Sequence, residues 1–527
     1  MLKSLNFKNM LQKVRMLFFA GVLLCVAIPF HAQQRTISAD LNKEAGLRKK
    51  VYNECVGAGR ASEGLRADWQ EHLRLVKQHC DFRYIRFHGL LNDEMGVCSV
   101  KDGKIIYNFH YIDVLYDFLL SVGIKPFVEL SFMPTPLKSN DKTIMWWKGN
   151  TSPPADYEEW ERLINSLAQH FTERYGEEEI KTWYFEVWNE PDLKDFFTGT
   201  EDEYHQMYAT AAKAIKAVNP AYRVGGPASA GKSWIPGFIN YCQTNNVPVD
   251  FISSHNYGVE GNLDEFGKYQ LFMGRNFQWM PTNVAYVRNL IVESGKSLEL
   301  HCTEWNTSYS FNDPVHDTYQ QAPYMLYVLK NTEKTANSMS FWAFTDIFEE
   351  GGPPPSAFHG GFGMLNEHGI KKPAFHVYDF LNRMGETELQ NTDTASWVCK
   401  SKGGSVQILA WNFELLQQGK KSNQVFYRQL LPSEKKGELK ILLQNVTPGN
   451  YVCTISSVGF EKGDVFTAYY KMGLPVELST AQESYLKGIG DNVLYKKDII
   501  TIGADGKFET VLPLRTNDVY LVELIKI

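Results

Sequence analysis

Residues 182–191 read Thr-Trp-Tyr-Phe-Glu-Val-Trp-Asn-Glu-Pro, an apolar run that ends in an amide, a carboxyl and a proline. A short and mostly apolar run of this kind is typical of a strand in a parallel sheet whose two faces are both covered. Pro191 disfavours helical backbone angles at Glu190, so this carboxyl should stay at the strand end and not enter a helix. The stretch therefore predicts a buried strand over 183–189 with chemically active groups at its carboxyl end.

Similar runs recur on both sides of this stretch. The other candidate strands cover 54–59, 84–88, 126–131, 223–227, 251–254, 298–303 and 338–344. Stretches with a 3.6-residue apolar period separate most of them, at 67–79, 111–122, 157–175, 203–218 and 318–330. Eight strand–helix repeats in about 330 residues predict the α/β class and a (β/α)8 TIM barrel. We assign the barrel to residues 51–387.

The sequence changes character after residue 387. Short alternating runs at 405–411, 439–443, 451–456, 499–502 and 519–525 are separated by Gly, Pro, Asn and Asp, and Asp505-Gly506 is a hairpin signal. This pattern predicts a β-sandwich domain over 388–527. Within the N-terminal segment 33–50, residues 35–39 form a candidate strand that could join the sandwich.

The first 32 residues have the pattern of a secretory signal. Four basic residues precede an apolar run at 16–30, and Ala32 is a plausible cleavage residue. Fifteen apolar residues are short for a membrane-spanning helix, although a retained anchor is the alternative. No later stretch is long and apolar enough, so we expect a secreted or periplasmic mature chain without a membrane span. Seven cysteines remain in that chain, an odd number with no C-x-x-C, which favours free thiols.

Composition excludes several functions. The chain has 54 basic and 60 acidic residues, a net charge of −6, and no basic run, which argues against nucleic-acid binding as the main task. No cluster has the spacing of metal ligands, and we expect no metal and no cofactor. Aromatic residues make up 13% of the chain, which suits sugar ligands even though most aromatics are core.

Polar side chains gather where the predicted strands end. They are Arg86, His88, Glu129, Asn189, Glu190, His255, Tyr257, Glu304, Trp342 and Asp346. The carboxyl ends of barrel strands are where TIM-barrel enzymes hold their catalytic groups. This coincidence over many strands predicts one active site at that mouth.

Glu190 and Glu304 close the fourth and seventh predicted strands, 114 residues apart. Two carboxyls facing each other over a barrel mouth can cleave a glycosidic bond, one as a proton donor and the other as a nucleophile or base. The alternative is a pair of structural ion pairs. Because an ionised Glu304 would disfavour a second charge nearby, we expect Glu190 to have the higher pKa.

Several motifs together extend this interpretation to a family. The motifs lie at 84–91, 126–134, 185–191, 255–257, 303–309, 314–318, 358–363 and 471–475. With them the chain resembles glycoside hydrolase family 39, and most closely its bacterial β-xylosidases. The resemblance implies that Glu190 is the general acid/base and Glu304 the nucleophile of a retaining enzyme. Departures at Phe87 and in the loop 351–355 leave fine substrate choice open.

The resemblance also implies the substrate-binding residues. Asn189 would hold the sugar 2-hydroxyl, and His255 and Tyr257 would contact the nucleophile and the sugar. His88 and Glu350 match positions that line the sugar subsite. From the residues alone, Trp342 is either a sugar platform or a core aromatic, and its strand-end position favours the platform. Arg86 either neutralises buried carboxylates or positions Glu304, and Trp146 and Trp147 are candidates for a leaving-group subsite.

The predicted function is an exo-acting retaining β-xylosidase that acts on xylo-oligosaccharides. Within the family, an α-L-iduronidase-like or arabinosyl-releasing activity is the alternative, and a uronidase should present Lys or Arg to the sugar carboxylate. A carbohydrate-binding protein without catalysis is a third reading, against which the presence of both Glu190 and Glu304 argues. The exact sugar, its linkage, the leaving-group length and the oligomeric state do not follow from the sequence.

Overall fold

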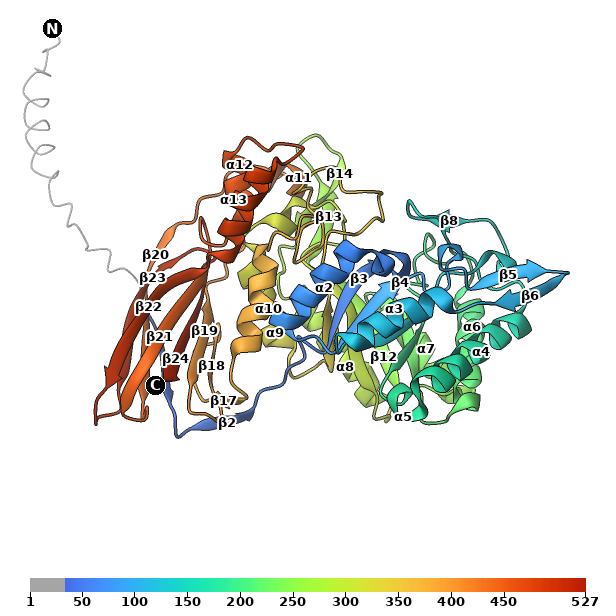
Figure 1. The fold of residues 1–527 in the computed structure, drawn as a ribbon, viewed down its shortest axis with the longest axis horizontal. Coiled ribbons are helices and arrows are strands. Elements are labelled where there is room, and N and C mark those ends of the chain that lie inside the picture. The colour runs from blue at the N-terminus through green and yellow to red at the C-terminus, as the bar shows by residue number, and fades with distance from the viewer. Residues whose placement is uncertain (1–33) are drawn as a thin grey trace, which may run out of the picture.

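The computed structural model describes residues 34–527, and its centre is a closed barrel of eight parallel strands (Figure 1). In barrel order the strands are β3 (Cys55–Arg60), β4 (Tyr84–His88), β7 (Lys125–Leu130), β10 (Tyr184–Val187), β11 (Arg223–Ala230), β12 (Phe251–Tyr257), β15 (Glu299–Asn306) and β16 (Ser338–Phe341). Each overlaps one of the eight predicted strands, which confirms the TIM-barrel prediction. β10 ends at Val187, so Asn189 and Glu190 already belong to the loop that follows.

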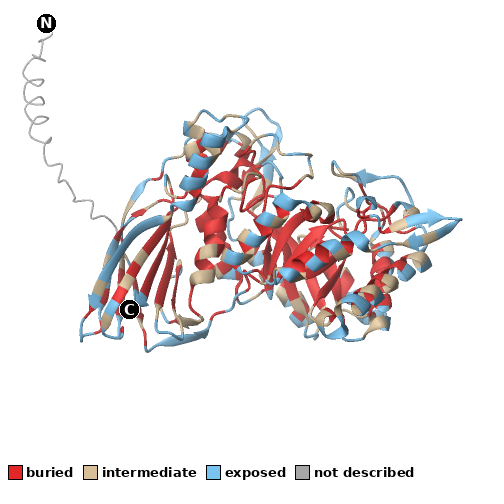
Figure 2. Ribbon diagram, in the orientation of Figure 1, coloured by how far each residue is buried: buried red, intermediate tan, exposed pale blue. Residues whose placement is uncertain are grey.

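Helices surround the barrel. They are α2 (Ala67–Cys80), α3 (His110–Ser121), α4 (Tyr157–Tyr175), α5 (Glu177–Ile180), α6 (Glu201–Val218), α7 (Ile235–Thr244), α8 (Trp279–Glu293), α9 (Gln321–Thr332) and α10 (Pro373–Arg383). The strands and the inward helix faces are buried (Figure 2). The sequence did not predict the short α5, nor α7, α8 or α10. α7 and α10 have proline in the first turn, where the helix needs no N–H donor, so proline starts these helices and does not break them.

Short hairpins and 3-10 turns lie in the loops that connect the barrel strands and helices. Three hairpins pair β5 (Cys98–Lys101) with β6 (Lys104–Tyr107), β8 (Thr143–Ile144) with β9 (Gly149–Asn150), and β13 (Val259–Leu263) with β14 (Tyr269–Met273). Single 3-10 turns are η1 (Ala61–Leu65), η2 (Asp93–Met95), η3 (Thr135–Leu137) and η4 (Pro314–Asp317). The hairpin β13–β14 leads from β12 into α8 and so lies beside the barrel mouth.

The C-terminal region is rich in strands, which form two sheets. The larger has the order β2 (Glu44–Leu47), β17 (Thr387–Leu389), β18 (Ser396–Lys400), β19 (Val406–Trp411), β24 (Val519–Lys526), β21 (Gly449–Val458) and β22 (Leu494–Ile502). The smaller has the order β1 (Gln34–Asp40), β20 (Lys435–Gln444) and β23 (Phe508–Arg515). β1 pairs with β20 in parallel, so the strand expected at 35–39 joins this region. Ile37, Ile441 and Val522 belong to one apolar cluster that takes members from both sheets.

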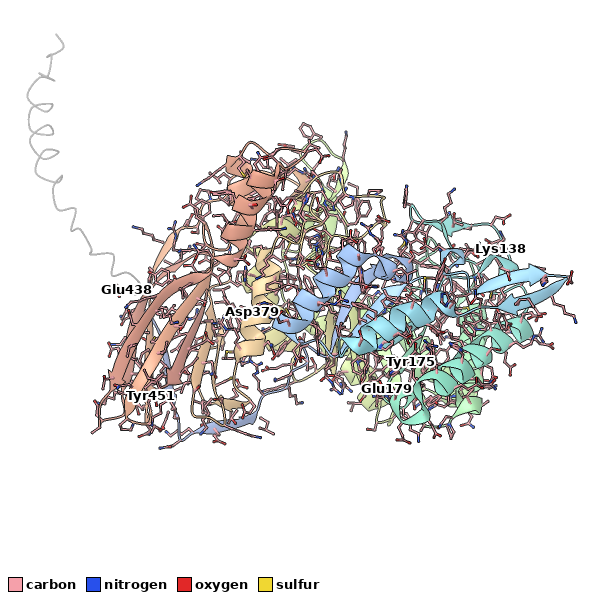
Figure 3. The ribbon with its side chains drawn as sticks, in the orientation of Figure 1. Lys138, Tyr175, Glu179, Asp379, Glu438 and Tyr451 are labelled. Atoms are coloured by element: carbon pink, nitrogen blue, oxygen red, sulfur yellow. The ribbon has the colours of Figure 1, made fainter. Side chains whose placement is uncertain are left out.

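Three helices that the sequence did not predict also lie in this region. They are α11 (Asn423–Phe426), α12 (Val465–Lys471) and α13 (Thr480–Asp491). α10 lies between the barrel and the larger sheet (Figure 1). Its Asp379, labelled in Figure 3, bonds to the His79 ring of α2 at 3.0 Å, and Arg383 one turn later pairs with Glu523 of β24. One helix thus ties the sheet to the barrel.

The predicted secretory signal at 1–32 lies outside the described residues. Among residues 34–527, no helix is both long and apolar enough to cross a membrane. The seven cysteines of this part of the chain are all free, as expected from their number and spacing.

Candidate active site

A cavity of about 560 Å³ opens at the carboxyl ends of the barrel strands. The residues that line it are His88, Asn189, Glu190, Leu193, Phe196, Ala230, Gly231, His255, Asn256, Tyr257, Val259, Trp279, Asn283, Glu304, Tyr309, Trp342, Glu350 and Phe362. All eight residues that were assigned from the sequence as catalytic or substrate-binding are among them, whereas Arg86, Glu129 and Asp346 of the strand-end group are not. Because parallel strands end at the same mouth, residues more than 260 positions apart, from His88 to Glu350, meet in one cavity.

The backbone around Glu190 is held in an uncommon conformation. Trp188 and Glu190 have φ angles of 75° and 45°, in the left-handed region that side chains other than glycine rarely adopt. The N–H of Glu190 donates to the Ala228 carbonyl at 2.9 Å, which fixes the loop against β11. Glu190 is therefore outside any helix, as Pro191 led us to expect.

Glu190 and Glu304 form a close pair. One oxygen of each carboxyl and a ring nitrogen of His255 lie within 4.8 Å of one another. His255 Nδ1 is 2.8 Å from Glu190 Oε1 and 3.5 Å from Glu304 Oε2. Retaining glycosidases have their carboxyls about 5–5.5 Å apart, and inverting ones about 6.5–9.5 Å apart. The pair fits the retaining arrangement.

Glu304 is held through both of its oxygens. The Arg86 guanidinium donates to Oε1 at 2.7 Å, and the Tyr257 hydroxyl donates to Oε2 at 2.7 Å. Arg86 is fully buried and also pairs with Glu129 at 2.8 Å and Glu186 at 2.5 Å. The two roles that the sequence left open for Arg86 are thus combined, because it neutralises buried carboxylates and also orients Glu304.

Among residues 34–527, Glu190 has no Lys or Arg within ion-pairing distance, and its one basic neighbour at that range is the ring of His255. Burial, followed by the negative charge of Asp192, raises the pKa of Glu190 to about 8. Burial also lowers the pKa of His255, so this ring is neutral and does not force the proton from Glu190. The expected direction for Glu190 is right, but the main cause is desolvation and the charge of Asp192, and not the charge of Glu304.

The sugar-facing wall has charge of both signs. His88 Nδ1 is 2.9 Å from Glu129, and its Nε2 is 3.7 Å from Glu304 and 3.9 Å from Glu350. Although burial opposes a charge on His88, the carboxylates of Glu129 and Glu304 raise its pKa to about 9. Burial, together with the charges of Glu304 and Glu190, raises the pKa of Glu350 to about 8 even though His88 opposes this. This wall can therefore both donate and accept hydrogen bonds to hydroxyl groups.

Two clusters among residues 34–527 have ligand atoms close enough to hold a metal ion. One is Glu190, His255 and Glu304, and the other is Asp346, His359 and Glu367. A buried cation already neutralises a carboxylate of each, since Arg86 pairs with Glu304 and Lys372 pairs with Asp346 at 2.9 Å. These donor sets are therefore poorly suited to a further positive charge.

A family model described as glycosyl hydrolases family 39 matches residues 35–504. The chain belongs to glycosyl hydrolase family 39. It is 37% identical to a β-xylosidase of Geobacillus stearothermophilus over 489 residues, which is 90% of this chain and 93% of that protein. It is 42% identical to a β-xylosidase of Caldicellulosiruptor saccharolyticus over 357 residues, which is 67% of this chain and 72% of that protein. A crystal structure of a monomeric β-xylosidase from Caulobacter crescentus superposes with a TM-score of 0.91 at 38% identity, covering 94% of this chain and 100% of that one.

The aromatic residues of this family 39 chain differ in whether they line the cavity. Trp342 lines it and is 1% exposed, with its ring centroid 4.7 Å from that of His88, so it combines a cavity contact with a packed position. Trp146 and Trp147, candidates from the sequence for a leaving-group subsite, are not among the residues that line the cavity. Trp279 does line it, and no pattern in the sequence singled it out because it starts a helix and does not directly follow a barrel strand.

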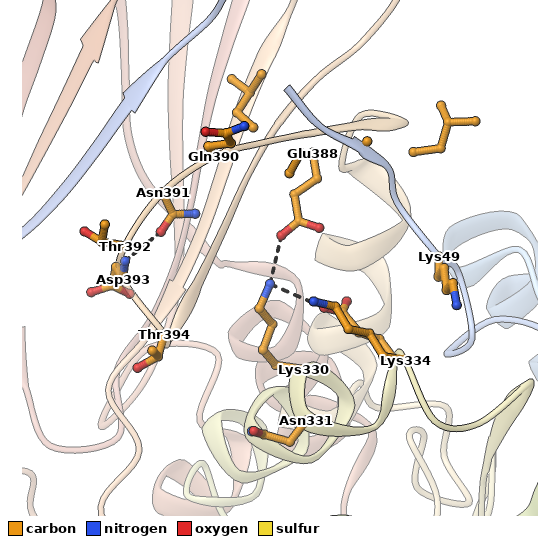
Figure 4. Close-up of a pocket in the computed structure, with 15 residues that line it drawn as sticks. Lys49, Lys330, Asn331, Lys334, Glu388, Gln390, Asn391, Thr392, Asp393 and Thr394 are labelled. Carbon is orange, nitrogen blue, oxygen red and sulfur yellow. Dashed lines mark hydrogen bonds and ion pairs between the residues drawn. The ribbon is translucent and has the colours of Figure 1, made fainter. Parts of the chain in front are cut away.

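A larger groove of about 650 Å³ lies away from this mouth, between α9 and the β2–β17 edge (Figure 4). Its carboxylates are all engaged in structural contacts. Glu388 accepts from Lys330 at 2.9 Å, Asp393 pairs with Arg35 at 2.5 Å, and Glu333 accepts from the Trp397 indole at 3.1 Å. No carboxyl pair is free for catalysis in the described part of this groove, so the glycosidase chemistry belongs to the barrel mouth.

Proposed function

We propose that this protein is an exo-acting retaining β-xylosidase that releases xylose from xylo-oligosaccharides. The observation that carries the proposal is the pair of carboxyls within 4.8 Å, of which Glu304 is pinned by Arg86 and Tyr257 while Glu190 keeps its proton to about pH 8. The two β-xylosidase relatives, at 37% and 42% identity, support xylose as the sugar.

In the first step, Glu304 acts as the nucleophile. One of its carboxylate oxygens forms a bond to the anomeric carbon while the bond from that carbon to the leaving oxygen breaks. Glu190 gives its proton to the leaving oxygen, which departs as an alcohol. The product is a glycosyl ester on Glu304, and Glu190 is now a carboxylate.

In the second step, Glu190 acts as the base. It removes a proton from a water molecule, whose oxygen attacks the anomeric carbon from the face that the leaving group vacated. The ester bond breaks, Glu304 regains its negative charge, and the sugar leaves with its original anomeric configuration. Two inversions at one carbon give net retention.

The remaining polar residues of the cavity position the sugar. We assign Asn189 to the 2-hydroxyl, following the family resemblance, and His88, His255, Tyr257 and Glu350 to the ring and its other hydroxyls. The Asn189 side-chain carbonyl accepts from Arg86 at 2.9 Å, so its amide N–H₂ is free to face the sugar. Trp342 packs against the ring of His88.

The lining of the cavity favours a neutral sugar over a uronic acid. No Lys or Arg is among the described residues that line it, and its cation His88 already faces the carboxylates of Glu129 and Glu304. This argues against the iduronidase-like alternative. An arabinosyl-releasing activity and a binding protein without catalysis are distinguished by experiment.

We also propose the wider organisation that the sequence suggested. Residues 1–32 would be removed on export to the periplasm or the medium, and residues 51–387 would form the catalytic barrel. Residues 33–50 and 388–527 would fold as one β-sandwich, a proposal supported by the pairing of β1 with β20 and by the apolar cluster shared between the two sheets.

The test is hydrolysis of a panel of 4-nitrophenyl glycosides: β-D-xyloside, α-L-arabinofuranoside, α-L-arabinopyranoside and α-L-iduronide. We expect the β-xyloside to have the highest kcat/KM, with β-xylose as the first sugar product detected by NMR before mutarotation. Preference for another glycoside, or a first product of α-configuration, would contradict the proposal.

A further inference from the structure

One side of the cavity at the barrel mouth is rich in apolar residues. The end of β11 and the segments that follow β10, β11 and β12 contribute six of them, which we call the apolar arc: Leu193, Phe196, Ala230, Gly231, Val259 and Trp279. The end of β4 and the segment that follows β16 contribute the titratable residues His88 and Glu350, together with Phe362. Since β10, β11 and β12 are neighbours in the barrel, the segments that carry the arc are adjacent.

The apolar arc lies on the same side as the proton donor. Glu190 is in the loop after β10, between the strand end and Leu193, and its N–H bonds to the carbonyl of Ala228 in β11. A general acid must lie within hydrogen-bond reach of the leaving oxygen. The group attached to that oxygen therefore extends from Glu190 towards the exposed Leu193 and Trp279 of the arc, whereas the cleaved sugar lies against the buried His88 and His255.

We propose that the apolar arc is the leaving-group subsite and that Trp279 is its stacking platform for the next pyranose of an oligosaccharide. This inference rests on the proposed glycosidase function. Trp279 is 48% exposed at the first residue of α8, so a large part of its indole is open to a ligand. The C–H face of a pyranose packs well on such an aromatic surface.

The platform is held in place before a ligand arrives. Lys232, in the loop after β11, has its Nζ 5.6 Å from the Trp279 ring and 4.3 Å from the Tyr286 ring, so one cation bridges two aromatics of α8. Asp192 anchors that loop by accepting from the Ser229 hydroxyl at 2.8 Å and the Ala230 N–H at 2.9 Å. Asp192 therefore links the loop that carries Glu190 to the segment that leads into Lys232.

Trp146 provides a matched comparison. It is 56% exposed, close to the exposure of Trp279, and the sequence made it, with Trp147, a candidate for this same role. It does not line the cavity, and its indole lies against Gly352 in the loop after Glu350. Its replacement should therefore leave the leaving-group subsite intact.

The experiment compares two xylose donors that differ only in the leaving group. Xylotriose fills the leaving-group side, whereas β-xylosyl fluoride leaves it empty. In Trp279→Ala, we expect the ratio of kcat/KM for xylotriose to kcat/KM for the fluoride to fall about tenfold, the effect of losing one stacking contact. Trp279→Phe should restore most of the ratio, and Trp146→Ala should leave it unchanged. The ratio does not depend on the fraction of folded enzyme, so reduced folding of a variant cannot imitate the effect.

Two results would overturn the inference. One is that Trp279→Ala has the same ratio of kcat/KM values as the wild type, while the wild type cleaves both donors. The proposed subsite would then be wrong, whereas the β-xylosidase function would stand. The other is that the ratio falls equally in Trp146→Ala, which would show that the control residue Trp146 contributes as much to the leaving-group subsite as Trp279. A wild type that cleaves neither donor would instead overturn the proposed function and the subsite with it.

Discussion

The two ends of the barrel hold buried and half-buried carboxyls in opposite ways. At the amino-terminal end, Glu299 at the start of β15 accepts hydrogen bonds from the His301 ring at 3.1 Å and the Tyr184 hydroxyl at 2.8 Å. The hydrogen bond from His301 lowers the pKa of Glu299 to about 2. At the carboxyl end, burial and Asp192 raise the pKa of Glu190 to about 8.

This difference shows how one fold keeps a carboxyl ionised at one end of the barrel and another carboxyl protonated at the other end. Around Glu299 the side chains of Cys55, Tyr84, Phe127, Tyr184 and Phe251 form an apolar cluster beside a small cavity of about 210 Å³, and donors satisfy the charge. Around Glu190 the cavity is larger, at about 560 Å³, and the buried cation Arg86 is committed to Glu304, Glu129 and Glu186. A carboxyl with matched donors is ionised and structural, whereas one buried without a cation keeps a proton that it can transfer.

The largest effect should come from Glu304→Ala. The variant has no oxygen to form the glycosyl ester, so hydrolysis of every glycoside should fall by at least about 10⁴-fold. Added azide should fill the vacated space and attack the substrate directly, giving the α-xylosyl azide, whose configuration NMR reports. A β-azide from this variant would mean that the roles of the two carboxyls are reversed.

Glu190→Ala should show a smaller loss that depends on the leaving group. Hydrolysis of xylobiose should fall by about 10²–10⁴-fold because the leaving oxygen no longer receives a proton. An aryl xyloside with an acidic phenol should still form the glycosyl-enzyme, seen as a burst of phenol before a slow second step. Azide should restore turnover and give the β-azide. The absence of any dependence on leaving-group acidity would contradict the acid role.

The pH dependence of Glu190→Gln tests the raised pKa. The wild type should lose kcat/KM for xylobiose as pH rises through about 8, because Glu190 then gives up the proton that the leaving group needs. The residual activity of the glutamine variant should lack this alkaline limb.

The same carboxyl should also affect stability with pH. Glu190 ionises near its ordinary pKa in the unfolded chain but near 8 in the folded one, so its favourable contribution is complete below about 4.5 and is lost as pH rises through 8. The melting temperature of the wild type should therefore fall relative to that of Glu190→Gln between pH 5 and pH 9. A constant difference between the two melting temperatures from pH 5 to pH 9 would contradict the raised pKa of Glu190.

Glu299→Gln tests the other end of the barrel. Since the pKa of Glu299 is lowered, its contribution to stability is present above its ordinary pKa and is lost as pH falls from about 4.5 towards 2. Its side chain is 41% exposed, so solvent screening reduces the effect of the substitution on the free energy of unfolding at pH 7 to about 1 kcal/mol. Urea denaturation measures this loss, and kcat should remain within about twofold of the wild type. A large loss of kcat would show that the two ends are coupled.

The smallest effect should come from Asp192→Asn. Removing this negative charge should lower the pKa of Glu190, and the alkaline limb of kcat/KM should move down by less than about one pH unit. Asparagine can still accept from the Ala230 N–H through its side-chain oxygen, and its amide N–H₂ can donate to the Ser229 hydroxyl. Asp192→Glu, which keeps the charge, serves as the control. An alkaline limb that does not move would assign Asp192 a purely structural role.

Much of the barrel could be predicted because its signals are local. The apolar runs of eight strands and the polar residues at their ends are visible within a few positions, and all eight predicted site residues meet in the cavity. Helices α7, α8 and α10 were missed because proline near their starts imitates a helix breaker. The predicted cause of the raised pKa of Glu190 was wrong, because burial depends on packing that no local sequence pattern reveals.

The sequence by itself determined the class of fold and the identity of the carboxyl pair, because strand period and strand ends are encoded by neighbouring residues. Only the tertiary structure decided which groups set the proton affinity of each carboxyl. Arg86 reaches Glu304 across 218 positions of sequence, and the neutral His255 meets Glu190 across 65. Trp279 lines the cavity and Trp146 does not, because the start of α8 borders it. Proton affinity and ligand contact depend on distance in space, burial and charge, and these are fixed only when the barrel closes.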